Sequence, residues 1–501
     1  MRALLPILAA SVLLSPLTAG SLVDAVKSGN LPAVQQSLDQ RADPNQAGSD
    51  GTTALHWAVQ SDRLDIVQAL ISAGARVNVT NRYGITPLAL AVTTGNPSIA
   101  GRLLKAGADP NVPVPELGTP LLAAARTGNP EVLKELLDAG VNVNQPEPAS
   151  GQTALMWAAT EAHEAAVDVL LAAGADSRAR SHKGESALFF AVRAGDIGVV
   201  DALLAAGADV NERAEPDNLS RPGNPDPAQS KSKTPGDSML VVAIVNGHFG
   251  LADFLLNKGA DPNAAGVRWP PLHALVRVRN YEETQYPPPM FKAGDLDSLD
   301  LAAHLLAHGA DPNTRSTTKT ARRTPGDQNY AELQGATPFF LAAKAGDVPM
   351  MRLLLSAHAD STIPSDDHTS PLMVASGVGC VPGQWIEPER DILAAVKILV
   401  DELKADVNVA NDRHETPLHG AVCRGADFVV QYLADRGANL DAKDVEGKTP
   451  LDTALNGIFR ATSIGGPPII ILRFPEHTAT LVKKLTAEQH AASSPSRAAV
   501  R

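Results

Sequence analysis

A short motif that recurs at a nearly constant interval constrains this chain more than any single residue. Threonine or serine residues that precede apolar runs are spaced 33, 33, 34 and 33 residues apart, at Thr53, Thr86, Thr119, Thr153 and Ser186. A fixed period of about 20 to 50 residues indicates an array of stacked units rather than a single globular core. Because each unit in such an array contacts only its neighbours, a length of 501 residues does not require several domains.

Each interval contains the same series of predicted elements. A threonine or serine can cap a first helix, and proline often follows at the first helical position, as in Thr86-Pro87. A glycine such as Gly95 then supplies the left-handed backbone conformation that ends a helix. A second helix returns with apolar residues at helical spacing, as in Ile197–Leu204, and stops at a Gly-Ala-Asp-x-Asn motif. The pattern predicts a helix–turn–helix unit followed by an extended loop.

These motifs resemble those of the ankyrin-repeat family. The resemblance is carried by Thr416-Pro417-Leu418-His419, Gly259-Ala260-Asp261-Pro262-Asn263 and Gly437-Ala438-Asn439, and it extends from Ser21 to about Leu485. It implies an all-α solenoid of stacked helix–turn–helix units with projecting β-turn loops. It also implies that the first helices and the loops line a concave side, where ankyrin arrays generally bind partners.

Counting the helix starts predicts twelve units. The first, Ser21–Asn45, is degenerate and acts as a cap, because an outer unit has one face against water. The last is interrupted by Asn456–Pro475. The eleven units after the cap, the last included, open near Thr53, Thr86, Thr119, Thr153, Ser186, Ser238, Pro270, Thr337, Ser370, Thr416 and Thr449.

The N-terminus has the features of a secretory leader. A single charge at Arg2 precedes the apolar stretch Ala3–Leu14 and the small residues Thr18-Ala19-Gly20. This pattern predicts a signal peptide over residues 1–20 and therefore an exported protein, either periplasmic or secreted. An apolar capping helix is the alternative. The stretch is too short to span a bilayer, so no membrane insertion is predicted.

The remaining sequence divides into four predicted regions. Regular repeats, including the cap, occupy 21–211, and repeats with inserted loops occupy 238–485. Between them, 212–237 is rich in Pro, Asp, Ser and Lys with few apolar residues, which predicts a flexible insertion. A disordered tail is predicted over 486–501.

The inserted loops of the second half contain much of the chain's scarce aromatic content, which is 4% in total. Tyr, Trp, Met and Arg are enriched among the residues that dominate binding energy at interfaces. We therefore predict that the loops contact a partner; the alternative is that they cover apolar surface of their own repeats. The predicted partner-binding residues are Tyr281, Tyr286, Met290, Phe291, Tyr330 and Trp385, with Arg322 and Arg323 for charge.

The chain has two cysteines, Cys380 and Cys423, and neither belongs to a metal-binding pattern. Aligning the repeats places both near the turn between paired helices, in adjacent units. In an exported protein such a pair can form a disulfide. Two free thiols are the alternative.

Motifs for catalysis or cofactor binding are not found. The sequence contains no G-x-S-x-G and no P-loop. His304 and His308 have a spacing that can hold a metal, but no third ligand lies near them in the sequence. His56, His273 and His419 occupy the helix-opening motif and are expected to make local hydrogen bonds. We predict no catalytic, cofactor-binding or metal-binding residues.

These observations predict a non-catalytic scaffold that binds a protein partner of unknown identity through the concave groove and the inserted loops. The formal net charge of −12 argues against nucleic acid as the partner, and a monomer is expected. Two alternatives remain: an accessory or regulatory subunit of an exported enzyme, and an enzyme with a site beneath the C-terminal insertions.

Overall fold

The structure is a computed structural model. It describes residues 21–214, 236–264, 269–280, 296–317, 334–379, 389–456, 458–461, 470–473 and 476–493. These residues separate into two compact units, unit 1 up to Ala208 and unit 2 from Asp209 onward. Each unit is described separately below.

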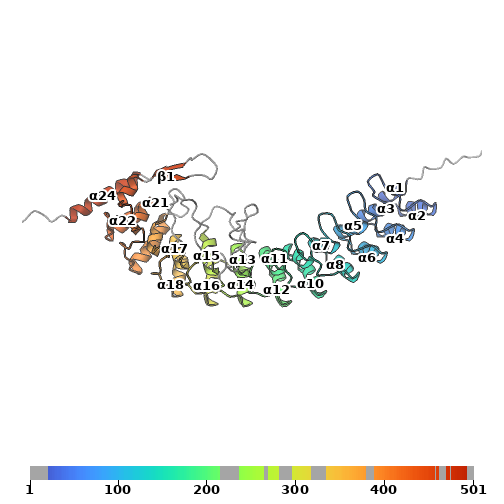
Figure 1. Cartoon of the computed structure of the whole chain (residues 1–501), viewed down its shortest axis with the longest axis horizontal. Helices are drawn as coiled ribbons and strands as arrows, with labels where there is room; N and C mark the ends of the chain where they lie inside the picture. The colour runs from blue at the N-terminus through green and yellow to red at the C-terminus, as the bar shows by residue number, and fades with distance from the viewer. Residues whose placement is uncertain are drawn as a thin grey trace, which may run out of the picture. The chain divides into compact units, whose positions relative to one another are not determined.

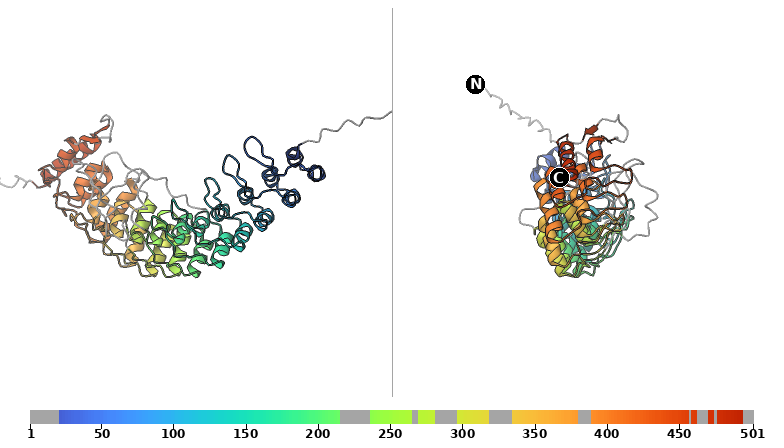
Figure 2. Two further views of the ribbon diagram at one scale, coloured as in Figure 1. Left: turned by 45° about the vertical axis from the view of Figure 1, so that its right-hand side comes forward. Right: turned by 90° about the vertical axis from the view of Figure 1, so that its left-hand side faces the viewer.

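Unit 1 is a stack of helix pairs arranged in two rows (Figure 1). The first helices of the pairs pack against one another in one row, and the second helices form the other row. Loops extend beyond the row of first helices (Figure 2). The first helices are α1 (Leu22–Lys27), α3 (Ala54–Gln60), α5 (Pro87–Thr94), α7 (Pro120–Thr127), α9 (Ala154–Thr160) and α11 (Ala187–Ala194). The second helices are α2 (Leu31–Asp39), α4 (Leu64–Ser72), α6 (Pro97–Lys105), α8 (Pro130–Asp138), α10 (Glu164–Ala172) and α12 (Ile197–Ala205).

Unit 2 repeats this arrangement. Its first helices are α13 (Met239–Val245), α15 (Pro271–Asn280), α17 (Pro338–Lys344), α19 (Pro371–Ser376), α21 (Pro417–Arg424) and α23 (Pro450–Asn456). Its second helices are α14 (Phe249–Asn257), α16 (Ser298–Ala307), α18 (Val348–Ser356), α20 (Glu389–Lys397), α22 (Asp427–Asp435) and α24 (Glu476–Ser493). A π-helical turn, η3 (Ile398–Glu402), directly continues α20. The described residues therefore contain the twelve predicted helix pairs.

Most of the predicted helix starts coincide with N-caps. The Thr86 side chain accepts a hydrogen bond from the Ala89 backbone N–H, which would otherwise lack a partner in the first turn. The equivalent contact is made in other helix pairs by Thr119, Thr153, Ser186, Ser238, Thr337 and Ser370. At the other end of α5, Gly95 has a φ of 76°, so this helix ends as the glycine predicts.

The core lies between the two rows of helices within each unit. Small residues of the first helices are fully buried, including Ala58, Ala91, Ala124 and Ala158, which lets consecutive helices approach closely. Larger apolar residues of the second helices complete each layer, as Val67 and Leu70 do on α4. Each layer therefore buries its apolar surface against the adjacent pairs.

Asparagine side chains join consecutive pairs at the ends of the second helices. Asn78 Nδ2 donates to the carbonyl of Gly107 at 2.8 Å, and its Oδ1 accepts from the backbone N–H of Asp109 at 2.8 Å. The same two-bond contact recurs at Asn45, Asn144, Asn211, Asn263, Asn313 and Asn408. The asparagine that ends the Gly-Ala-Asp-x-Asn motif thus links each of these helix pairs to the next one.

The final helix pair is interrupted, as predicted. Two antiparallel strands, β1 (Ile458–Ala461) and β2 (Ile470–Arg473), lie between α23 and α24. The all-α class holds for the solenoid, with this hairpin as an addition. Helix α24 packs against α22 and α23, and so takes the place of the second helix of the last pair.

The predicted tail over 486–501 is wrong for its first part. Helix α24 continues to Ser493. The loop after α22 holds it there, since Gln489 Nε2 donates to the carbonyl of Ala438 at 3.1 Å and His490 Nε2 lies 2.6 Å from Asp441 Oδ2. Residues 494–501 lie outside the described part of the chain.

The two ends of the predicted insertion at 212–237 pair with each other. Arg213 and Ser238 form an antiparallel bridge, and the Ala214 N–H donates to the carbonyl of Asp237 at 2.9 Å. Residues 215–235 lie outside the described ranges, so the flexibility of this insertion stays a prediction.

Candidate protein-binding surface

The partner-binding residues predicted from the sequence lie outside the described part of the structure. This holds for Tyr281, Tyr286, Met290, Phe291, Arg322, Arg323, Tyr330 and Trp385. Their role stays a prediction. The first helices lie within the described ranges, and so do the loops that precede them in unit 1.

Histidines tie the start of two first helices to the following loop. The Thr53 backbone N–H donates to His56 Nδ1 at 3.2 Å, and His56 Nε2 lies 3.0 Å from the carbonyl of Ile85. Because Nδ1 accepts, Nε2 carries the proton and donates to the carbonyl. Burial lowers the pKa of His56, which keeps the ring neutral at pH 7. The predicted local hydrogen bonding of His56 is confirmed.

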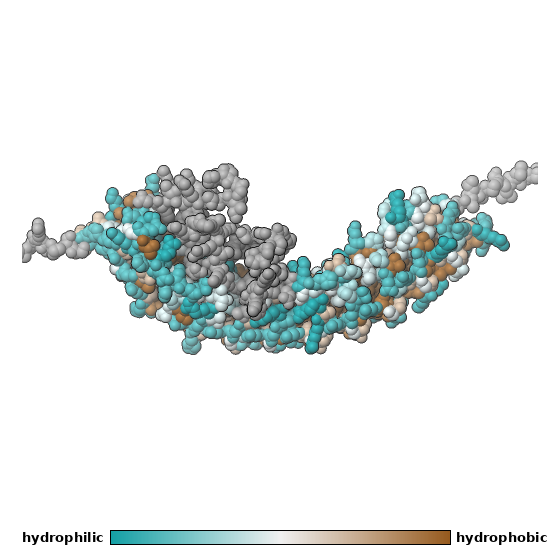
Figure 3. All heavy atoms as spheres, in the orientation of Figure 1, coloured by the Kyte–Doolittle hydropathy of each residue, from teal (hydrophilic) through white to brown (hydrophobic). Residues whose placement is uncertain are grey.

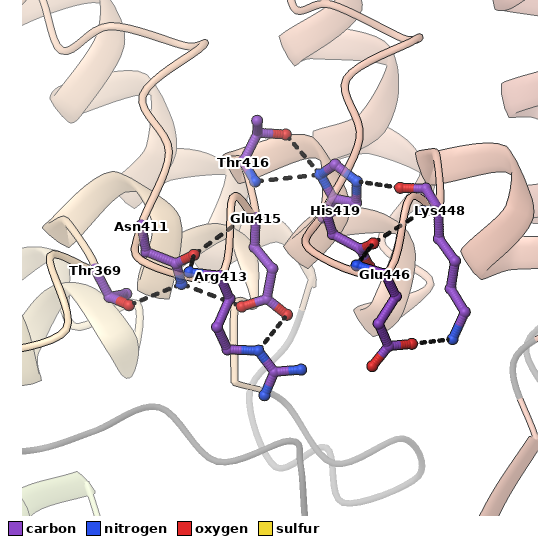
Figure 4. Close-up of polar contacts among 9 residues, drawn as sticks. Thr369, Asn411, Arg413, Glu415, Thr416, His419, Glu446 and Lys448 are labelled. Atoms are coloured by element: carbon purple, nitrogen blue, oxygen red, sulfur yellow. Dashed lines mark hydrogen bonds and ion pairs between the residues drawn. The ribbon is translucent and has the colours of Figure 1, made fainter.

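The equivalent contacts in unit 2 are shown in Figure 4. The Thr416 N–H donates to His419 Nδ1 at 3.1 Å, and His419 Nε2 lies 3.3 Å from the carbonyl of Lys448. Burial lowers the pKa of His419 as well. In the same loop, Lys448 Nζ lies 2.5 Å from Glu446 Oε2, so the tip of the loop carries an ion pair.

A second network in Figure 4 joins two neighbouring loops of unit 2. Asn411 Nδ2 donates to Thr369 Oγ1 and to Glu415 Oε2, both at 3.1 Å. Asn411 Oδ1 accepts from the N–H of Arg413 at 3.0 Å. Asn411 is buried, so these bonds satisfy its amide and hold the loops in register.

An open hollow of about 450 Å³ lies between these loops and is lined by Thr362, Pro364, His368, Ser370, Val409, Ala410, Asn411 and Asp412. His368 Nδ1 lies 2.8 Å from Asp412 Oδ1. Ser370 accepts the N–H of Met373 as the N-cap of α19, and among the described residues no hydrogen bond joins it to His368. The hollow therefore contains the residue types of a hydrolase triad without the nucleophile–base contact that such a triad requires.

The first helices of unit 1 carry aromatic side chains covered by basic residues. Lys27 Nζ lies 4.3 Å from the centre of the Trp57 ring, and the Arg126 guanidinium lies 4.2 Å from that of Trp157. In both pairs the basic residue belongs to the helix pair before the one that holds the tryptophan. Both indole side chains are only partly buried, so these pairs lie at the surface.

Trp57 and Trp157 both stand four residues after the helix-opening threonine, and this shared register predicts packing against the neighbouring repeat. The basic side chain over each ring was not predicted. The basic partner of each ring comes from the adjacent helix pair, and the periodicity of the sequence alone does not indicate it. The visible face of unit 1 in Figure 3 shows hydrophobic residues as separate patches among polar ones.

His304, one of the two histidines with metal-like spacing, pairs with a carboxylate in the structure. His304 Nδ1 lies 2.7 Å from Asp253 Oδ1, which joins α16 to α14 on the second-helix row. Across the described ranges, no three His, Cys, Asp or Glu side chains gather as metal ligands would. None of the helices in those ranges is long and apolar enough to cross a membrane.

Cys423 lies near the end of α21 and is disulfide-bonded. Cys380 lies outside the described residues. The pairing of Cys380 with Cys423 therefore stays a prediction.

Comparison with known proteins identifies similar sequences and structures. The profile described as ankyrin repeats (three copies) matches residues 22–114, 121–214, 174–266 and 389–462, and the profile of the single ankyrin repeat matches 334–366. Alpha-latrocrustotoxin-Lt1a of Latrodectus tredecimguttatus is 32% identical over 134 residues, which is 26% of this chain and 8% of the toxin. Palmitoyltransferase ZDHHC13 of Homo sapiens is 33% identical over 142 residues, which is 24% of this chain and 23% of that protein.

This chain thus spans less than a quarter of each of these two relatives. Among solved structures, the human ASB11 ankyrin repeat domain has a TM-score of 0.36 and 26% identity, and the match covers 42% of this chain and 96% of that one. The family profiles match well over half of the chain, and the matched segments fall on the paired helices. The chain belongs to the ankyrin-repeat family.

Proposed function

We propose that this protein is a non-catalytic scaffold that binds a protein partner along its first helices and loops. Ankyrin repeats are generally protein–protein interaction modules. The observation that carries the proposal is the pair of tryptophans, Trp57 and Trp157, that lie partly exposed at the same register on α3 and α9. Each is covered by a basic residue, and Trp and Arg are among the residues most enriched at binding hot spots.

The absence of enzymatic activity belongs to this proposal. Its support is the hollow beside His368, where the serine is used as a helix cap. The human relative is named as a palmitoyltransferase, but this chain spans 23% of that protein. The name therefore does not extend to this chain.

Export is part of the proposal too. The pattern over residues 1–20 supports it, and so does the disulfide at Cys423, because disulfides persist mainly in oxidising compartments. Fractionation of cells that express the full chain, followed by N-terminal sequencing, tests this part. A cytosolic protein that keeps its first twenty residues would contradict it.

Affinity capture from the same compartment tests the binding function. The full chain is compared with the variant Trp57→Ala/Trp157→Ala and with a variant that lacks residues 281–295. We expect both variants to lose most of the captured partner and to keep the helical circular dichroism signal. If both retain it fully, neither the first helices nor that loop binds the partner.

A further inference from the structure

Charged residues are distributed unequally between the two rows of helices in unit 1. The first helices carry the basic residues Lys27, Arg126 and Arg193, with Asp24 as their one acidic residue. The second helices carry the acidic residues Asp39, Asp65, Glu131, Glu135, Asp138, Glu164, Asp168 and Asp201, and the basic residues Arg102, Lys105 and Lys134. A chain with a net charge of −12 thus has one basic row of helices.

The single acidic side chain on the first helices of unit 1 is used locally. Asp24 accepts from the Ser21 hydroxyl at 2.8 Å and from the Ser21 N–H at 3.3 Å, in the capping box of α1. It lies at one end of the unit, in the first helix of the stack. It therefore has little influence on the charge around Arg126, which belongs to α7, whereas Lys27 lies three residues after it on α1.

Two of the basic side chains are ordered by aromatic rings. Lys27 lies over Trp57, and the Arg126 guanidinium lies over Trp157 and donates from Nη1 to the carbonyl of Glu116 at 3.4 Å. Neither the rings nor this carbonyl carries a negative charge. Stacking on an aromatic face orders a guanidinium and leaves edge N–H groups for carboxylates.

The first helices of unit 2 show the same excess, with Arg277, Arg279, Lys344 and Arg424 against Asp452. There, however, Arg279 is already paired, because its Nε lies 2.7 Å from Asp347 Oδ2. Unit 1 is described without gaps from Ser21 to Ala208 and is the clearer case.

We propose that the partner of unit 1 is an acidic protein segment. It lies along the first-helix row, places Asp or Glu side chains on Lys27 and Arg126, and packs apolar groups on Trp57 and Trp157. This inference rests on the proposed binding function and adds the chemistry of the partner. Nucleic acid also carries negative charge, but ankyrin repeats are generally protein–protein interaction modules, and the oligonucleotide probe in the test below distinguishes the two ligands.

Labelled peptides test the proposal on the full chain. The probes are a peptide of repeated Glu-Glu-Leu triplets, its Gln-Gln-Leu and Lys-Lys-Leu counterparts, and single-stranded oligothymidylate, each followed by fluorescence anisotropy. We expect the Glu peptide to bind most tightly, and added salt to weaken it, since the contacts are partly exposed. Binding of the Lys peptide or of oligothymidylate at equal or higher affinity, or no binding of the Glu peptide, would overturn the proposal.

Charge reversal identifies the row that binds. The variant Lys27→Glu/Arg126→Glu should weaken the Glu peptide at least about tenfold, which corresponds to about 1.4 kcal/mol. The matched control Lys105→Glu/Lys134→Glu makes the same change of charge at two exposed residues of the second helices in the same unit. It should change the affinity less than about twofold. Equal weakening in both double variants would show a general effect of net charge and refute the assignment to the first helices.

The captured partner separates this inference from the proposed function. If the charge-reversed variant captures the partner as well as the unaltered chain does, the binding function stands and the acidic segment is wrong. If the Glu peptide binds as expected but no protein is captured, the surface chemistry is right and the scaffold function fails.

Discussion

His273 is buried with its Nδ1 atom unpartnered among the described residues, and Pro270 stands three positions before it. In the corresponding place, Thr53 and Thr416 each supply a backbone N–H and a hydroxyl to the histidine three residues later. Proline has neither group. On the other side of the His273 ring, Nε2 lies 3.0 Å from the carbonyl of Ala336.

We expect unit 2 to lose stability in mild acid through His273. Burial lowers the pKa of His273 from 6.5 to about 4, so the folded state holds the neutral ring. The unfolded chain binds the proton first, and stability is therefore complete above pH 6.5 and falls as the pH drops toward 4. The loss reaches about 3 kcal/mol, because each tenfold decrease in the proton affinity of the folded state corresponds to about 1.4 kcal/mol.

Urea unfolding at a series of pH values measures this effect, with His273→Gln as the comparison. Glutamine keeps a donor for the Ala336 carbonyl and does not titrate. The variant should show a smaller loss of stability between pH 6.5 and 4 than the unaltered chain. Identical pH profiles would mean that His273 does not contribute to the acid sensitivity.

The substitution Pro270→Thr should stabilise unit 2 by about 1 kcal/mol. It restores the N–H and the hydroxyl for His273 Nδ1, and an unsatisfied buried group costs about 1 to 3 kcal/mol. Part of this gain is offset because proline restricts the unfolded chain. Chemical denaturation measures the change. In a His273→Phe background the gain should vanish, and a gain of the same size there would contradict the hydrogen-bonding explanation.

Substitution of one asparagine that joins consecutive helix pairs should destabilise unit 1. Asn78→Ala removes both hydrogen bonds to the next pair, at Gly107 and Asp109, and should cost about 1 to 2 kcal/mol. Asn111 occupies the same place one pair later, but its side chain bonds only to Asp109 within its own loop. Asn111→Ala should cost less than about 0.5 kcal/mol. Equal losses of stability in denaturant unfolding would show that the hydrogen bonds between helix pairs add nothing to the stability of unit 1.

Gly420 on α21 should not tolerate alanine. A Cβ atom there would lie 2.4 Å from the backbone N of Val378 and 2.8 Å from the carbonyl carbon of Gly377, so the chain after α19 packs directly against this helix. Such overpacking costs about 1 to 3 kcal/mol. In an open helix the same change stabilises by up to about 1 kcal/mol.

Gly250 on α14 is the matched control for Gly420, because a Cβ there would have no neighbour within 4 Å. In thermal unfolding, the melting temperature of Gly250→Ala should equal or exceed that of the unaltered chain, and that of Gly420→Ala should be well below it. A stabilised Gly420→Ala protein would rule out the close approach.

Peptide mapping under non-reducing conditions tests the partner of Cys423. The expected result is one linked peptide that contains Cys380 and Cys423, the two cysteines of the chain. Carrying out the digest in alkylating agent guards against exchange. Disulfide-linked dimers joined through Cys423 would show that the bond is intermolecular and would contradict the pairing with Cys380 of the same chain.

The amino-acid sequence was sufficient to predict the number of units, the start of each first helix and the interruption of the last pair. These features depend on groups close together in the chain, such as the Thr86 hydroxyl and the Ala89 N–H. A hydrogen bond that spans three residues follows from local chemistry, and the repeat period multiplies the signal.

The contacts between neighbouring helix pairs became known only from the folded chain. The pairing of Arg126 with Trp157 and the place of α24 as the second helix of the last pair depend on how neighbouring layers stack. The charge of the first-helix row emerges from the same stacking, because it gathers basic residues that lie far apart in the sequence onto one row. Such contacts are set by packing between separate segments, which a local sequence pattern does not encode.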